Sequence, residues 1–199
     1  RVAGMERTAT NNDSSFFSIV STQDNNAISF TAAASLITYK GTTLPTDLVL
    51  NKDEVFIVSF SRENVVKYIG TLITSTKDIV VTTGTMYGSF SNEIIDSPPL
   101  TADDNKDYFT GGDMGMDQLV SITPAVDATA YIIVKGDSFN SIENALIIAD
   151  EDGTQINING VPYKDPETGQ QTLNAGDHFF VEGTSYSATS PLQYMQITS

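Results

Sequence analysis

The sequence predicts an all-β protein made of two related sandwich-like units. Short segments rich in Val, Ile, Phe, Tyr and Thr recur along the 199 residues, and apolar and polar side chains alternate within most of them. Turn-forming Asn, Asp and Gly separate these segments, and the sequence contains no convincing amphipathic helix. Several sequence blocks also occur twice in the same order, which indicates an internal duplication. Blade-type repeats are the alternative architecture, because several short strands recur in each copy.

Three blocks carry the duplication and keep their apolar positions aligned. Residues 19–30 align with 147–158, residues 50–58 align with 173–181, and residues 73–75 align with 197–199. Because repeats usually form stacked structural units, these blocks predict architecture rather than one catalytic pocket.

The expected organisation is an upstream linker at 1–15, a first β unit at 16–88, an acidic Gly- and Pro-containing loop at 89–117, and a second β unit at 118–199. We expect both ends of the sequence to be cut from a longer protein. The second unit is expected to be truncated at its C-terminus, because only the first copy continues past its third block.

Period-2 alternation and β-branched or aromatic composition define the expected strands. Those of the first unit are Phe16–Ser21, Ala27–Thr31, Ser35–Tyr39, Asp47–Leu50, Val55–Phe60, Tyr68–Thr74 and Ile79–Gly84. Those of the second unit are Leu119–Ile122, Tyr131–Lys135, Ala145–Ala149, Gln155–Ile158, His178–Val181 and Tyr194–Thr198.

Turns are expected at equivalent positions of the two copies, at residues 24–26, 51–54, 151–153 and 174–177. The first turn of each copy is predicted to close a tight hairpin, since Asn and Gly accept the positive φ that such turns require. We expect the carboxylates of Asp24 and Asp152 to accept hydrogen bonds from their own backbone two residues on, which needs no ligand.

Two longer loops are expected. The first runs from Ser89 to Gly115 and contains two prolines, an acidic run and several glycines. The second runs from residue 159 to residue 169, where Pro162 and Pro166 argue against an interior strand.

Composition excludes several function classes. The formal net charge of −15 and a pI near 4.1 disfavour nucleic acid and anionic membrane surfaces as partners. The sequence contains no Cys, so neither a disulfide nor thiolate chemistry is available. No apolar run approaches the length of a membrane span, so we expect no membrane insertion.

Catalytic motifs are missing from the sequence. It contains neither a Gly-x-Ser-x-Gly elbow nor a Gly-rich phosphate loop. The one histidine, His178, follows a Gly-Asp turn, as in cupin-like metal barrels, but those sites need several clustered histidines. The internal alignment places His178 opposite Val55, which favours a packing or surface position on a strand.

An acidic segment offers a candidate calcium site. Three oxygen-bearing residues alternate there, as in the opening of a calcium loop. The pattern then departs from that loop, because Tyr108 replaces the turn glycine and Met114 the closing Glu. A less regular site remains one interpretation, and a merely solvated acidic loop is the other. The candidate ligands are Asp103, Asn105, Asp107, Asp113 and Asp117.

Four motifs give the sequence a family resemblance. In order they are Asp-Met-Gly-Met-Asp-Gln-Leu-Val (113–120), Tyr-Ile-Ile-Val-Lys-Gly (131–136), Ala-Asp-Glu-Asp-Gly-Thr-Gln-Ile-Asn-Ile-Asn-Gly (149–160) and Leu-Asn-Ala-Gly-Asp (173–177). The chain from about residue 16 onward resembles large repetitive surface proteins of gliding Bacteroidetes, in the region related to the IgGFc-binding protein N-terminal domain. One departure is the insertion of Ser121–Thr123 before Pro124.

The resemblance implies type IX secretion, display at the cell surface and a role in adhesion, and it transfers no catalytic residues. We therefore expect a non-catalytic structural and adhesive fragment of a large secreted surface protein, without a cofactor apart from the candidate Ca²⁺. Neighbouring domains of the same long chain and a glycan or protein surface ligand are the expected partners. A carbohydrate-active or cupin-like enzyme domain is the alternative.

Overall fold

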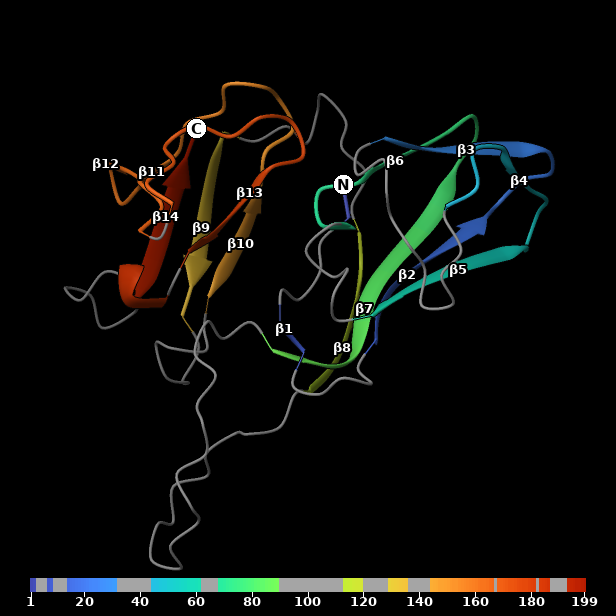
Figure 1. The fold of residues 1–199 in the computed structure, drawn as a ribbon, viewed down its shortest axis with the longest axis horizontal. Helices are drawn as coiled ribbons and strands as arrows, with labels where there is room; N and C mark the ends of the chain where they lie inside the picture. Colours follow the sequence, from blue (N-terminus) through green and yellow to red (C-terminus); the bar gives the residue numbers. More distant parts are fainter. Residues whose placement is uncertain are drawn as a thin grey trace, which may run out of the picture.

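The computed structural model describes residues 1–2, 7–8, 14–31, 44–61, 68–89, 113–119, 129–135, 144–166, 168–181, 183–186 and 193–199. These residues form antiparallel β-strands joined by turns, and the helical element that lies wholly within them is the short 3-10 helix η2 (Gly183–Ser185). The prediction of an all-β fold is confirmed (Figure 1). Within the part of the chain that is described, no helix has the length and apolar character needed to span a membrane.

The first half of the chain forms two antiparallel sheets. The larger contains β1 (Arg7–Thr8), β7 (Ile79–Ser89), β2 (Ser14–Ser21) and β5 (Val55–Ser61) in that order, and β8 (Asp113–Gln118) also pairs with β7. The smaller contains β4 (Leu48–Leu50), β3 (Asn26–Thr31) and β6 (Leu72–Ser75).

One hydrophobic core lies between these two sheets. It takes Phe17 and Ile19 from β2, Phe60 from β5 and Ile28 from β3. Alternate residues of a strand point to one face, so each sheet contributes one apolar face to this core. Two sheets over a shared core form a sandwich-like arrangement rather than a single-sheet blade.

Tyr68 is buried in the same core. Its ring stacks on Phe60 with centroids 4.2 Å apart and an interplanar angle of 6°. Its hydroxyl is buried without a hydrogen-bond partner, as is that of Ser15. Burial raises the pKa of Tyr68 to about 12, and the nearby Ser15 hydroxyl offsets part of the rise although neither hydroxyl reaches hydrogen-bond geometry.

The second half also forms two antiparallel sheets over its own core. One pairs β10 (Ala145–Ile148) with β13 (His178–Val181). The other has the order β12 (Val161–Pro162), β11 (Asn157–Ile158), β14 (Tyr194–Thr198) and β9 (Ala130–Val134). The fully buried side chains include those of Leu173, Phe179, Val181 and Met195. Two separate cores favour the predicted division into two units, which we retain as a prediction.

The duplicated blocks occupy equivalent places in the two halves. In the first half β2 pairs with β5 and places Ile19 opposite Phe56. In the second half β10 pairs with β13 and places Ile147 opposite Phe179. Both pairs are the ones that the sequence alignment equates.

In the other sheet of each half, the duplicated blocks also pair in equivalent ways. β3 pairs with β6, with Phe30 opposite Ile73, and β11 pairs with β14, with Ile158 opposite Ile197. A shared pairing register across two sheets explains why the apolar positions of the two copies stay aligned: a slip of one residue would turn every apolar side chain outward.

Several local predictions are wrong. Residues 68–71 do not start a strand: Tyr68 is helical, residues 69–70 form a turn, and the Thr71 N–H donates to the Tyr68 carbonyl. The predicted hairpin turns at 24–26 and 151–153 instead join strands of different sheets, because β2 does not pair with β3 and β10 does not pair with β11. Residues 113–117 were expected to be loop, but Asp113–Gln118 forms β8, which is held by its backbone pairing to β7.

Parts of the expected upstream linker belong to the first half of the fold. Val2 is fully buried in the first core and Arg7–Thr8 pairs with β7, so these parts of residues 1–15 are not a linker. Ser35–Tyr39 lies outside the described residues. Of the expected strand Leu119–Ile122, only Leu119 is described, and it follows β8 without belonging to a strand.

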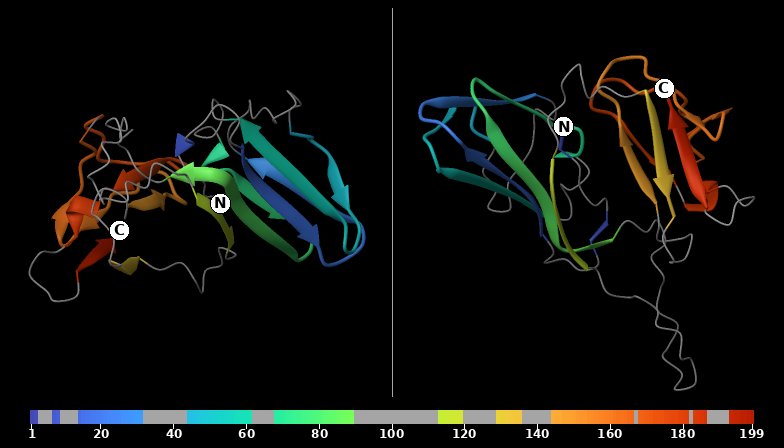
Figure 2. Two further views of the ribbon diagram at one scale, coloured as in Figure 1. Left: turned by 90° about the horizontal axis from the view of Figure 1, so that it is seen from below. Right: turned by 180° about the vertical axis from the view of Figure 1, so that it is seen from behind.

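The two halves meet near the N-terminus, which lies between them (Figures 1 and 2). Arg1 Nε donates to Asp150 Oδ1 over 2.8 Å, and another Arg1 nitrogen donates to the Gly70 carbonyl over 3.1 Å. Gly70 itself packs against the backbone of Gly176, and a Cβ added at Gly70 would lie 1.9 Å from the Gly176 carbonyl oxygen. Direct backbone packing therefore joins the halves at this point.

Candidate functional site

Asp24 and Asp152 occupy equivalent positions and make equivalent contacts. The Lys52 N–H donates to Asp24 Oδ1 over 3.0 Å, and the Ala175 N–H donates to Asp152 Oδ1 over 2.9 Å. The prediction that each carboxylate bonds its own backbone is therefore wrong, because each accepts from the neighbouring turn. The prediction that these aspartates have a structural role is supported by the same contacts.

The neighbouring turn is also repeated in detail. The Asn51 N–H donates to Glu54 Oε2, and the Asn174 N–H donates to Asp177 Oδ2 over 2.9 Å. The third turn residue has a positive φ in both copies, 66° at Asp53 and 93° at its counterpart in the second turn. Turn geometry thus explains these repeated acidic residues.

The candidate calcium ligands fall into two groups. Asp103, Asn105 and Asp107 lie outside the described residues. Asp113 and Asp117 lie on β8, where their backbones pair with Gly88 and Thr83. Four residues of extended strand separate their Cα atoms by about 13 Å. The calcium site stays a prediction.

His178 begins β13, where it is partly buried and lies opposite Ile148 of β10. Its counterpart Val55 lies opposite Val20 in the same register. The predicted strand position of His178 is confirmed. Among the residues that the structure describes, no three His, Cys, Asp or Glu side chains gather closely enough to hold a metal ion.

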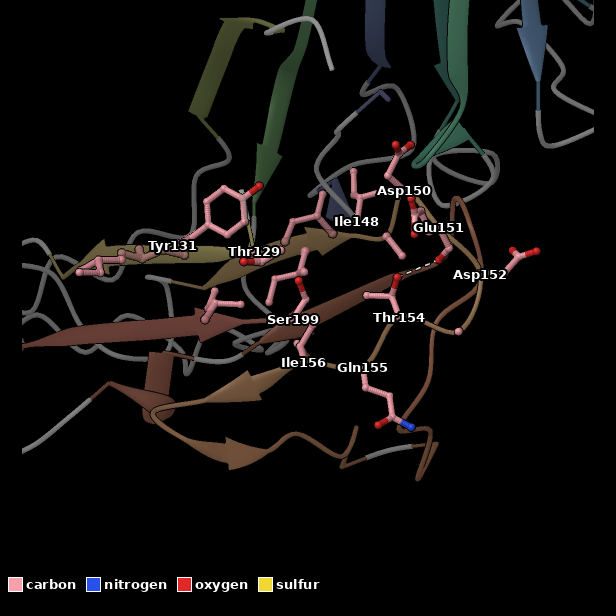
Figure 3. Close-up of a pocket in the computed structure, with 17 residues that line it drawn as sticks. Thr129, Tyr131, Ile148, Asp150, Glu151, Asp152, Thr154, Gln155, Ile156 and Ser199 are labelled. Atoms are coloured by element: carbon pink, nitrogen blue, oxygen red, sulfur yellow. Dashed lines mark hydrogen bonds between the residues drawn. The ribbon is translucent and has the colours of Figure 1, made fainter. Parts of the chain in front are cut away.

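An open groove of about 760 Å³ lies in the second half, between β9 and β10 (Figure 3). Its walls are mainly apolar and include Tyr131 and Ile132 of β9 and Ile147 of β10. Three consecutive acidic residues, 150–152, lie at the opposite end from Tyr131. Apolar walls with a few polar groups at one end are typical of binding sites.

The groove exists because β10 has one neighbour where β2 has two. β2 pairs with β5 on one side and β7 on the other. Among the described strands, β10 pairs with β13 alone. Accordingly Ile19 is fully buried, whereas its counterpart Ile147 is only partly buried and lines the groove. No motif or repeat in the sequence indicates this groove.

The fold and the groove define an all-β protein with two sandwich-like cores and an apolar surface site. A family model described as IgGFc binding protein matches residues 1–199, and the chain belongs to this family. The predicted relation to the IgGFc-binding region is therefore confirmed. The family description names a binding activity rather than a reaction, in agreement with the prediction that the chain is not an enzyme. No curated protein and no solved structure matches the chain.

Proposed function

We propose that this chain is a non-catalytic adhesive module of a large secreted protein displayed at the cell surface. The groove between β9 and β10 carries the proposal, because it has apolar walls and an acidic end. Among the described residues, no cluster of metal-ligating side chains accompanies it. Family membership supports binding as the class of activity. Gliding motility and type IX secretion rest on the sequence resemblance alone.

Surface chemistry limits the partners of this module. A net charge of −15 disfavours nucleic acid and anionic lipid, which leaves proteins and glycans as surface ligands. Exposed Tyr131, Ile132 and Val134 lie together on β9. Aromatic and aliphatic side chains on an accessible strand are suited to contacts with a protein surface.

Beads coated with the purified chain test the proposal directly. Their adhesion to surfaces carrying immobilised proteins, including the Fc fragment of IgG, and immobilised glycans is compared with that of uncoated beads. Hydrolysis of glycosides and esters is assayed on the same preparation and on His178→Ala. We expect adhesion without turnover, and turnover that His178→Ala abolishes would assign the chain to the alternative enzyme class.

We further propose that any calcium bound by the protein uses the acidic segment containing Asp103, Asn105, Asp107, Asp113 and Asp117. A divalent cation would relieve repulsion among the carboxylates and stabilise the native state. The test is thermal unfolding in millimolar CaCl₂ against EDTA, with MgCl₂ as the control for screening. An unchanged midpoint assigns this segment to a solvated acidic loop.

A further inference from the structure

Arg1 connects the two halves of the fold through three hydrogen bonds. Its Nε donates to Asp150 Oδ1 over 2.8 Å, its Nη2 donates to the Asp150 carbonyl over 3.0 Å, and its Nη1 donates to the Gly70 carbonyl over 3.1 Å. The Arg1 side chain is only 9 % exposed. Because a guanidinium is planar and its charge strengthens each bond, these contacts hold the two halves in one relative position.

Val2 fixes Arg1 to the first half. The Val2 side chain is fully buried in the first core. Its N–H donates to the Thr71 carbonyl and its carbonyl accepts from the Gly70 N–H, both over 2.8 Å. The backbone that carries Arg1 is therefore part of the first half, and only the guanidinium reaches the second half.

The two copies of the duplication differ at the residues that receive this contact. The alignment equates Asp150 with Thr22 and Gly176 with Asp53. Thr22 bonds within its own half, where its hydroxyl donates to the Asp78 carbonyl over 2.9 Å, and Asp53 is exposed. The repeated turn geometry therefore does not explain Asp150 and Gly176, whereas contact with the first half does.

We propose that Arg1 and Val2 form a strap that couples the two halves, so that a loss of structure in one half is transmitted to the other. The Arg1–Asp150 ion pair is the charged end of this strap, and the packing of Gly70 on Gly176 is a second point of the same joint. Asp150 also lines the groove, so the strap fixes the acidic end of the groove relative to the first half.

Native-state hydrogen exchange of the 199-residue chain, followed by mass spectrometry, measures the coupling. Val58→Ala leaves a cavity in the first core and should accelerate the slowest-exchanging amides of β10 and β13 at least about fivefold. Arg1→Met in the same chain should remove most of this acceleration. Glu151→Gln is the matched control, because it removes the adjacent charge and leaves both partners of Arg1 in place, and it should preserve the acceleration.

Phe179→Leu in the second core supplies the reciprocal experiment, since coupling between two halves acts equally in both directions. It should accelerate exchange in β2 and β5 of the otherwise unmodified chain, and much less in the Arg1→Met chain. Independent halves would show no acceleration across the joint in either experiment. An acceleration that Arg1→Met leaves unchanged would assign the coupling to the glycine contact alone. Either result would overturn the strap.

The relative position of the halves is tested by spin labelling, which is specific because the sequence contains no Cys. Val49→Cys on β4 and Val161→Cys on β12 place labels at exposed sites at opposite ends of the molecule (Figure 1). We expect a narrow distribution of label distances that Arg1→Met and Asp150→Asn broaden and Glu151→Gln does not. A distribution that neither Arg1→Met nor Asp150→Asn broadens would overturn the proposal.

Discussion

Gly70→Ala should destabilise the joint between the two halves. The methyl group would lie 1.9 Å from the Gly176 carbonyl oxygen, far inside van der Waals contact, and the atom it meets belongs to the backbone and cannot rotate away. Either the turn at residues 68–71 or the turn that contains Gly176 must then move.

Two costs add at this position. Gly70 has a φ of 83°, and an L-residue in this left-handed region costs roughly 1–2 kcal/mol. Overpacking of a close contact costs roughly a further 1–3 kcal/mol. We therefore expect the free energy of unfolding to fall by about 2–5 kcal/mol.

Gly153→Ala separates the two costs. Gly153 has a similar φ of 80°, but no atom lies within 4 Å of an added Cβ. This control should lose only about 1–2 kcal/mol. Urea unfolding of both variants, followed by tyrosine fluorescence and far-UV circular dichroism, measures the difference. Equal losses in the two variants would refute the packed joint at Gly70.

Three further predictions concern single side chains. Tyr68→Phe should be neutral or stabilising by about 1 kcal/mol at pH 7, because it removes a buried hydroxyl without a partner. In the unmodified chain the pKa of Tyr68 is about 12 in the folded state and 10.0 in the unfolded state. Because the unfolded state loses this proton first, the free energy of unfolding keeps its full value below pH 10 and falls by about 3 kcal/mol as the pH rises toward 12. Tyr68→Phe should lose that part of the alkaline dependence in urea titrations, whereas Tyr131→Phe, at an exposed site, should retain it. Asp24→Ala and Asp152→Ala should each cost about 1 kcal/mol by removing one exposed hydrogen bond between turns, and a thermal midpoint unchanged in both would contradict the shared role.

The equivalence of the two copies was predictable because the duplicated blocks keep one register, whereas the strand pairing was not, since the predicted hairpins join strands of different sheets. The equivalence of Val55 and His178, read from the alignment, matches their places opposite Val20 and Ile148. Local composition led to two wrong predictions of secondary structure. Tyr68 and Ile69 are apolar like strand residues, yet they are buried within a turn that a glycine of positive φ completes.

β8 was missed for the opposite reason. Its sequence Asp-Met-Gly-Met-Asp-Gln has little β-propensity, and its strand conformation comes from pairing with β7, which is distant in sequence. The groove could not be derived from any single segment either. It arises from a difference between the neighbours of two strands in space, with β7 beside β2 and no described strand in the same place beside β10.

The unequal support of β2 and β10 also has a mechanical consequence. Seven residues of β2 pair with β5 and seven pair with β7, whereas four residues of β10 pair with β13. Strands loaded along their length resist tension through all their cross-strand hydrogen bonds at once. Of the two strands, β10 therefore has fewer described cross-strand pairs to resist a load along its length.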